Sequence, residues 1–129
     1  RKEYLAVVEG RPPRADGVID NLLTEGRDLR VRVGPGPDAK RAVSRYRVVK
    51  GRDGYTLVAV TIETGRKHQI RVHLAGLGCP VAGDRMYGAT TDPAGRLGLH
   101  AWRLAFAHPT TGAAVRLESP LPAALRRVV

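Results

Sequence analysis

Residues 64–78 read TGRKHQIRVHLAGLG, and this stretch carries the clearest helical pattern in the chain. Ile70, Leu74 and Leu77 recur at the spacing of one face of an α-helix. Thr64 is typical of a helix N-cap, and the glycine that closes the stretch is typical of a residue just past a helix end. The pattern therefore predicts a helix over about residues 66–77.

The segments on either side of this stretch favour strands. Residues 55–63 have few polar positions, which predicts a central strand covered on both faces, and residues 51–54 (GRDG) are typical of a hairpin turn before it. Other helical predictions are a short helix over residues 18–23 and a terminal turn over residues 122–127. Further strands are predicted over residues 4–8, 29–33, 43–49, 101–107 and 113–118. The expected fold class is α+β, a mainly antiparallel or mixed β-sheet with one principal helix.

Length, charge and cysteine content narrow the class of protein. The 129 residues are typical of one domain, and no run of about 18 apolar residues could span a membrane. The single cysteine, Cys79, cannot form an internal disulfide, so we expect a reducing, cytoplasmic location. There are 22 Lys and Arg against 12 Asp and Glu, a formal net charge of +10. Such an excess attracts polyanions, and nucleic acid in particular.

The first basic segment lies at the start of the predicted helix. Arg66 and Lys67 stand where free backbone N–H groups favour a phosphate or a carboxylate. A solvated, charged first turn would have the same composition. Arg71 lies about 100° around the helix from Ile70, at the edge of the core. There its guanidinium needs a carboxylate or another fixed acceptor, either at a functional site or in a structural ion pair.

The second basic segment covers residues 40–52, with six Lys and Arg and no acidic residue. Alternation along a strand would put Arg45 and Arg47 on one face. This arrangement suits a stripe that follows a nucleic-acid backbone. An exposed sheet face that the charges keep soluble is the alternative.

Other site chemistries find little support in the sequence. His68 and His73 are five residues apart, so they do not share a helical face as zinc ligands do. The chain has no P-loop, no Gly-x-Ser-x-Gly and no dinucleotide-binding glycine motif. Its four Tyr, one Trp and one Phe are too few for a surface that stacks several bases.

Two motifs resemble those of the RluA-type RNA pseudouridine synthases. Residues 64–75, TGRKHQIRVHLA, match the signature TGR-x-HQIR-x-HL, and residues 78–88, GCPVAGDRMYG, match G-x-P-(I/V)-x-GD-x-x-YG. Further matches are KEYLA at residues 2–6, LHA at residues 99–101 followed by L-x-F-x-HP, and the closing Leu121-Pro122. The resemblance extends over the whole chain.

The resemblance implies an enzyme that detaches uracil from its ribose in RNA, turns the base and rejoins it through carbon 5, without a cofactor or a metal. Tyr4 matches the tyrosine that stacks on the flipped base and is a candidate for proton transfer. Arg71 matches the arginine that pairs with the catalytic aspartate. Ile70 and Leu74 would help to wall the uracil pocket. The implied partner is structured RNA, ribosomal or transfer, and the expected RNA contacts are Arg66, Lys67, His68, Gln69, Lys40, Arg41, Arg45 and Arg47.

The chain departs from the family at the nucleophile. None of its seven aspartates lies in the motif His-Arg-Leu-Asp-x-x-Thr-Ser-Gly, and Asp84 reads as a turn-former. Because that motif precedes the Lys-x-Tyr segment in the family, we expect residues 1–129 to be the C-terminal portion of a single catalytic domain. This portion would be inactive alone, with uncovered sheet edges that favour self-association. Arg71 would then turn toward water, an anion or another acid.

Two other interpretations stay open. The chain is either a non-catalytic relative that keeps the basic cleft, or a structural module whose charge matches an acidic partner. The first predicts salt-dependent binding of structured RNA by this chain alone.

Overall fold

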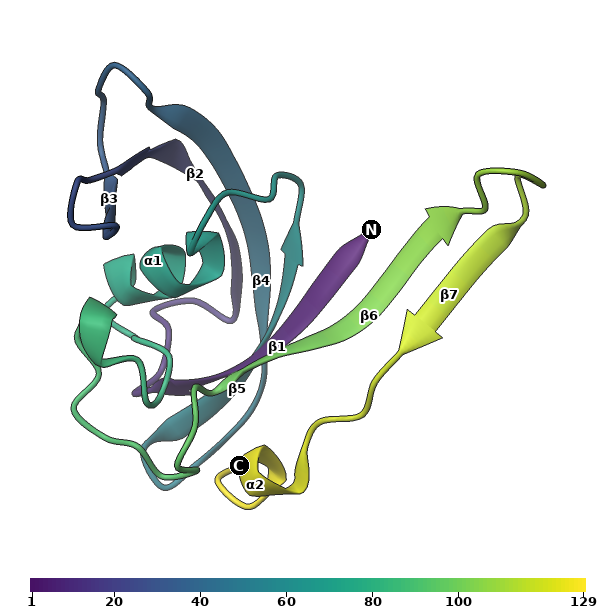
Figure 1. The fold of residues 1–129 in the computed structure, drawn as a ribbon. Helices are drawn as coiled ribbons and strands as arrows, with labels where there is room; N and C mark the ends of the chain where they lie inside the picture. The colour runs from purple at the N-terminus through teal and green to yellow at the C-terminus, as the bar shows by residue number, and fades with distance from the viewer.

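The computed structural model describes residues 1–129 as one antiparallel sheet with two helices (Figure 1). The strand order is β3-β2-β4-β5-β1-β6-β7, and every pair of neighbours is antiparallel. This confirms the predicted α+β class with a mainly antiparallel sheet. The strands are β1 (Lys2–Glu9), β2 (Asp16–Glu25), β3 (Val31–Val33), β4 (Lys40–Arg52), β5 (Tyr55–Ile62), β6 (Leu99–Ala107) and β7 (Ala114–Glu118). The helices are α1 (Gln69–Gly76), α2 (Ala123–Arg126) and a 3₁₀ turn, η1 (Arg85–Tyr87).

The sheet is strongly curved. Figure 1 shows β2, β3 and β4 bending around α1, whereas β6 and β7 reach away as a long hairpin. The two faces of the sheet carry separate apolar clusters, because successive residues of a strand point to opposite faces. On one face Ala6, Val8 and Val58 pack against Ile70 and Leu74 of α1. On the other face Leu5, Val7, Leu57 and Ala59 pack against Leu125 and Val129 at the C-terminal end of the chain.

Strand β5 is the central strand of the sheet, as its apolar sequence predicts. It is fourth of seven in the strand order, and its residues 56–60 are all buried. The predicted turn before it is present, with Asp53 at φ 52° and Gly54 at φ 84°. Two successive positive φ angles match the right-handed twist of a β-hairpin, and glycine adopts such an angle without steric cost.

Helix α1 is shorter than the predicted range of 66–77. It begins at Gln69, because His68 adopts a left-handed conformation with φ 55° that interrupts the helical path. Gly78, with φ 81°, lies just past the end of α1, where the predicted stop stands. The backbone N–H of Cys79 donates to the carbonyl of Leu74 at 3.1 Å, which closes the last turn. Neither α1 nor α2 has the length and apolar character needed to cross a membrane.

Two predictions of secondary structure are wrong. Residues 18–23 were expected to form a helix, and they lie inside strand β2. Their burial alternates with a period of two, since residues 16–23 of β2 pair with β4 and Leu23 is buried on the α1 side of the sheet. The strand expected over residues 29–33 covers only Val31–Val33, because Leu29 has a φ of 64° in the turn after Gly26.

Candidate functional site

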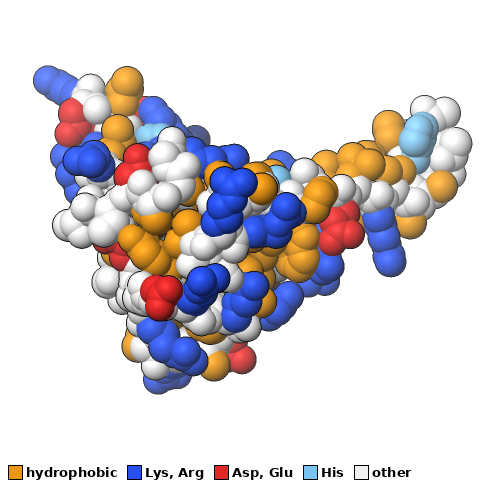
Figure 2. Space-filling model, turned by 90° about the horizontal axis from the view of Figure 1, so that it is seen from below, with side chains coloured by type: hydrophobic (Ala, Val, Ile, Leu, Met, Phe, Trp, Pro, Cys, Tyr) orange, Lys and Arg blue, Asp and Glu red, His pale blue; other side chains and the backbone are white.

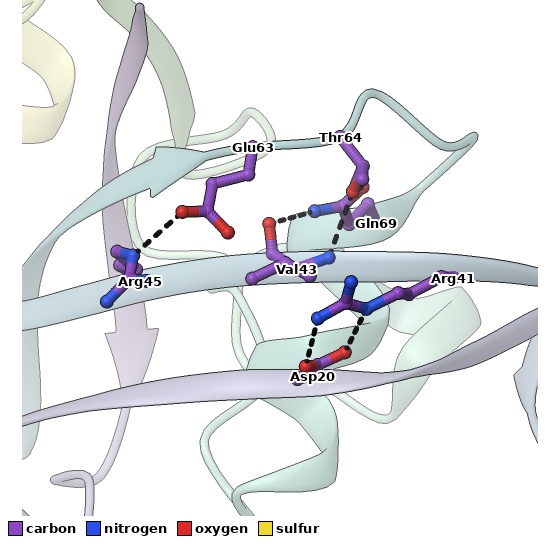
Figure 3. Close-up of polar contacts among 7 residues, drawn as sticks. All are labelled: Asp20, Arg41, Val43, Arg45, Glu63, Thr64 and Gln69. Carbon is purple, nitrogen blue, oxygen red and sulfur yellow. Dashed lines mark hydrogen bonds and ion pairs between the residues drawn. The ribbon is translucent and has the colours of Figure 1, made fainter.

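The loop before α1 is held by side chains of its own motif. Gln69 Oε1 accepts hydrogen bonds from the Arg66 backbone N–H at 3.0 Å and from the Thr64 hydroxyl at 2.7 Å. The Val43 N–H donates to the Thr64 hydroxyl oxygen at 2.9 Å, which ties this loop to β4 (Figure 3). The position of Thr64 predicted a helix N-cap, but its side chain does not cap the helix. It joins the loop to the sheet instead.

A buried polar network continues from Gln69 beneath α1. The Gln69 amide donates to the Ser44 hydroxyl and to the Val43 carbonyl, each at 2.9 Å. His73 Nδ1 lies 2.7 Å from Ser44 Oγ, and His73 Nε2 lies 2.8 Å from Asn21 Oδ1. Burial lowers the pKa of His73 to about 4, so its ring is neutral at pH 7. The network fixes one face of α1 against β2 and β4.

Gln69 is 3 % exposed, and both ends of its amide are bonded inside the protein. Its expected contact with RNA is therefore replaced by a positioning role in the loop. The buried role of Gln69 was not predicted, because the sequence around a glutamine at a helix start is the same whether its side chain faces solvent or the sheet.

Arg71 projects from α1 toward the segment that follows the helix. Its Nε and one Nη each donate to a different oxygen of the Asp84 carboxylate at 2.8 Å, and the Asp84 side chain is 1 % exposed. The hydrogen bonds with Asp84 raise the pKa of Arg71, so the guanidinium is charged. Its central carbon also lies 5.1 Å from the centre of the Tyr87 ring. Without the catalytic aspartate, Arg71 was expected to turn toward water, an anion or another acid. In the structure its partner is an acid, Asp84, which the sequence predicted as a turn residue.

Tyr4, Ile70 and Leu74 meet in the apolar cluster on the α1 face. Tyr4 is half-buried and packs against that cluster, to which Ile70 and Leu74 belong. Leu74 is 1 % exposed, so it supports the site from within the core. Tyr4 also lines an open cavity of about 280 Å³ between β1, β6 and β7.

A basic groove of about 510 Å³ opens beside the loop before α1. Lys40, Arg66 and Lys67, all predicted from the sequence, line this groove together with Arg27, which sequence reasoning missed. Lys67 is paired with Glu25 at 2.8 Å, and both side chains are partly exposed. The carboxylates that line the groove are Glu25 and Asp38, so cations are in excess there. Arg27 could not be predicted as a groove residue from the sequence, because only the folded structure brings the β2–β3 turn next to residues 65–67.

Arg41, Arg45 and Arg47 do not face this groove. Ser44 contacts α1, so its alternating neighbours on β4 point to the opposite face of the sheet. Figure 3 shows Arg41 turned toward Asp20 of β2 and Arg45 toward Glu63, with distances of 2.7 Å and 3.1 Å. The structure thus divides the expected RNA contacts between two faces of the sheet.

The surface retains a large positive excess after all ion pairs are formed. Eight ion pairs engage eight of the 22 Lys and Arg side chains. Figure 2 shows Lys and Arg spread over the body of the molecule seen from below, with few acidic side chains among them. On the projecting hairpin the apolar side chains of Phe106 in β6 and Leu117 in β7 are exposed. No three His, Cys, Asp or Glu side chains gather in a way that could hold a metal ion.

Comparison with known proteins gives one consistent result. Residues 1–76 match the family model described as RNA pseudouridylate synthase. The chain is 38 % identical over 129 residues to the uncharacterized RNA pseudouridine synthase YjbO of Bacillus subtilis, covering all of the chain and 46 % of that protein. It is 40 % identical over 131 residues to the ribosomal large subunit pseudouridine synthase D of Nitrosomonas europaea, covering 95 % of the chain and 38 % of that protein. The chain thus spans less than half the length of these relatives.

The structure of human RNA pseudouridylate synthase domain containing 4 has the same fold. It superposes with a TM-score of 0.80 at 27 % identity, over 98 % of this chain and 60 % of that one. Human RNA pseudouridylate synthase domain containing 1 gives a TM-score of 0.75 at 30 % identity, over 92 % of this chain and 54 % of that one.

Proposed function

The chain belongs to the RNA pseudouridylate synthase family, and we propose that it supplies the C-terminal portion of a catalytic domain that converts specific uridines in RNA to pseudouridine. In this reaction the bond from ribose carbon 1 to uracil N1 breaks and a bond to uracil carbon 5 forms. The proton lost from carbon 5 is balanced by one gained at N1, so no oxidant, cofactor or metal is required. The observation that carries the proposal is Arg71, which stands in the matching motif and is held by two hydrogen bonds at the edge of the α1 face.

Arg71 would act on a nucleophilic aspartate supplied by another segment of the same domain. Asp84 occupies Nε and one Nη, and the other Nη makes no hydrogen bond within the chain. This free amino group can hold a second carboxylate in its ionised form and aim it at the junction of sugar and base. Arg71 would thus bind two carboxylates, one structural and one reactive.

Tyr4 would stack on the flipped uracil and take part in proton transfer. Its half-buried ring is fixed against the cluster that contains Ile70 and Leu74, and these two residues would back the base pocket. A tyrosine ring provides a flat apolar face, and its hydroxyl provides a group that can donate or accept a proton.

The groove lined by Lys40, Arg66, Lys67 and Arg27 would bind RNA phosphates near the reacting nucleotide. His68, at the mouth of the same loop, would add a contact through Nε2, since its Nδ1 is bonded to Tyr87. Arg41, Arg45 and Arg47 would contact a more distant part of a structured RNA that bends around the sheet. We propose ribosomal RNA before transfer RNA as the substrate, because the names of two relatives refer to the ribosomal large subunit. The activity would take place in the cytoplasm.

The non-catalytic alternative rests on a sequence fact, the absence of the His-Arg-Leu-Asp motif from these 129 residues. The experiment that separates the two functions uses the full-length protein and RNA labelled with tritium at carbon 5 of uridine. We expect tritium release by the wild type and none by the variant Arg71→Ala. RNA binding without release by the wild type would favour the non-catalytic alternative. Self-association through uncovered sheet edges stays a prediction that sedimentation of the isolated chain can test.

A further inference from the structure

Both contacts of Arg71 come from one short segment, residues 84–87, which includes η1. Asp84 opens this segment and supplies the carboxylate, while Tyr87 closes it and supplies the ring. The segment is closed on itself, because the backbone N–H groups of Tyr87 and Ala89 donate to the Asp84 carbonyl. Asp84 and Tyr87 therefore both contact the Arg71 guanidinium from one short, hydrogen-bonded segment.

The Tyr87 ring is fixed at its far end by two hydrogen bonds. Its hydroxyl accepts the backbone N–H of Val31 at 3.0 Å and lies 2.6 Å from His68 Nδ1. Either the hydroxyl donates to Nδ1 or a protonated Nδ1 donates to the hydroxyl, and both arrangements hold the Tyr87 ring against His68. Burial, followed by the charges of Arg71 and Lys67, lowers the pKa of His68 and keeps that ring neutral. Tyr87 is 7 % exposed, so water does not compete for these bonds.

Tyr87 also contacts the turn between β2 and β3. The guanidinium carbon of Arg30 lies 5.4 Å from the centre of its ring, within the range of a cation–π contact. Arg30 and the groove residue Arg27 belong to the same exposed turn, and Val31 follows it directly. One side chain thus touches α1 through Arg71 and His68, and touches the β2–β3 turn through Val31 and Arg30.

We infer that Asp84 and Tyr87 are positioning residues for Arg71, and that Tyr87 sets the place of Arg71 relative to the basic turn at residues 27–30. The inference rests on the proposed function for its catalytic consequence. A free arginine side chain loses conformational entropy when it is fixed, and here that cost is met on folding. A guanidinium held in one place can orient a reactive carboxylate without rearrangement during the reaction.

A purely structural role explains the arrangement less well. Buried ion pairs are often no more stabilising than apolar residues of the same shape, because both charges lose their hydration. The Arg71–Asp84 pair also leaves one amino group free, which a group recruited for stability alone would be expected to bury. The arrangement fits orientation of a cation toward a further anion.

The test measures the single-turnover rate and the KM of the full-length protein for three test variants and one control variant. Asp84→Asn and Tyr87→Leu should lower the rate by about 10- to 100-fold while KM changes by less than about 2-fold. Tyr87→Phe loses the two hydrogen bonds of the hydroxyl but keeps the ring that contacts Arg71. Because the ring is kept, its rate should be closer to that of the wild type than the rate of Tyr87→Leu. Leu125→Ala, in the core on the other face, serves as the control that lowers Tm without changing the rate. If all four variants reacted at the wild-type rate, at temperatures where they are folded, the inference would be overturned.

A second measurement does not depend on activity. In the NMR spectrum of the 129-residue chain, the Nε–H of Arg71 should exchange slowly with solvent, because it donates to the buried Asp84 carboxylate. Asp84→Asn should speed this exchange by at least about 10-fold. Tyr55→Phe, at a ring whose hydroxyl makes no hydrogen bond within the chain, is the matched control. If the wild type lacks synthase activity and the protected signal is still lost in Asp84→Asn, the positioning stands and the proposed function fails. Fast exchange in the wild type would overturn the positioning itself.

Discussion

His73 Nε2 lies 2.8 Å from Asn21 Oδ1, and this contact joins α1 to strand β2 across 52 positions of the chain. The opposite ring nitrogen faces Ser44, so a neutral imidazole satisfies both neighbours. Since burial lowers the pKa of His73 to about 4 in the folded state, this network carries a dependence of stability on pH.

The free energy of unfolding should fall as the pH drops below about 6.5. The unfolded chain binds a proton at His73 near the ordinary histidine pKa, whereas the folded protein does not bind it until about pH 4. The unfolded state therefore gains protons first, and the loss between pH 7 and pH 5 should be about 2 kcal/mol. Urea unfolding at the two pH values measures it. In His73→Gln most of this difference should vanish, and an unchanged pH dependence would contradict the assignment to His73.

Arg71→Lys should separate binding from chemistry in the full-length protein. Lysine keeps the positive charge and loses the planar fork that holds Asp84 at two points. We expect turnover to fall by at least about 100-fold while the Kd for RNA changes by less than about 2-fold. Rapid-quench rates and filter binding give the two quantities. A parallel loss of affinity would mean that Arg71 binds the RNA backbone.

Lys40→Ala and Arg66→Ala should each weaken RNA binding and reduce the slope of log Kd against log salt by about one. Both residues line the groove beside the loop before α1, and neither has a carboxylate partner. Arg52→Ala is the control, since Arg52 lies at the opposite end of the strand that begins with Lys40. Equal changes in slope for the control and the groove variants would point to diffuse attraction by the net charge.

Arg47→Ala tests whether RNA also reaches the other face of the sheet. Arg47 is exposed and has no carboxylate partner, unlike Arg41 and Arg45, so its charge is fully available. We expect a reduction of the salt slope by about one, with no change in the rate of the bound complex. An unaltered slope would confine the RNA to the face that carries α1.

Tyr4→Phe should leave RNA affinity unchanged and lower the single-turnover rate. Phenylalanine keeps the aromatic face that packs against the α1-side cluster, and it removes only the hydroxyl. The loss should be about 100-fold or more if the hydroxyl transfers a proton. A rate equal to that of the wild type would restrict Tyr4 to holding the base.

The sequence predicted the sheet and α1 well because their apolar residues follow clear periods. Strand β2 was missed because Val18 is 53 % exposed and Leu22 is 42 % exposed, so apolar residues occupy both faces and imitate a helical pattern. The start of α1 was misplaced because the residues around His68 follow a helical pattern and give no sign of its left-handed backbone angle.

At the site, motif residues could be named from the sequence, but their partners could not. Arg71 was expected to need a carboxylate or another fixed acceptor, and its partner is the carboxylate of Asp84, whose Gly-Asp context is typical of a turn. Arg27 was missed because no motif marks it, and only the fold brings it next to Arg66 and Lys67. The two faces of β4 also divide a basic run that looks continuous in the sequence.

The left-handed backbone conformation of His68 has a practical consequence for protein engineering. Arg66 and Lys67 precede the helix and line one groove, whereas Arg71 belongs to the helix and points toward Asp84. We therefore expect changes at residues 66 and 67 to alter the charge of the groove while the Arg71–Asp84 pair stays intact. The groove and the Arg71–Asp84 pair can thus be varied independently, although they are encoded only four residues apart.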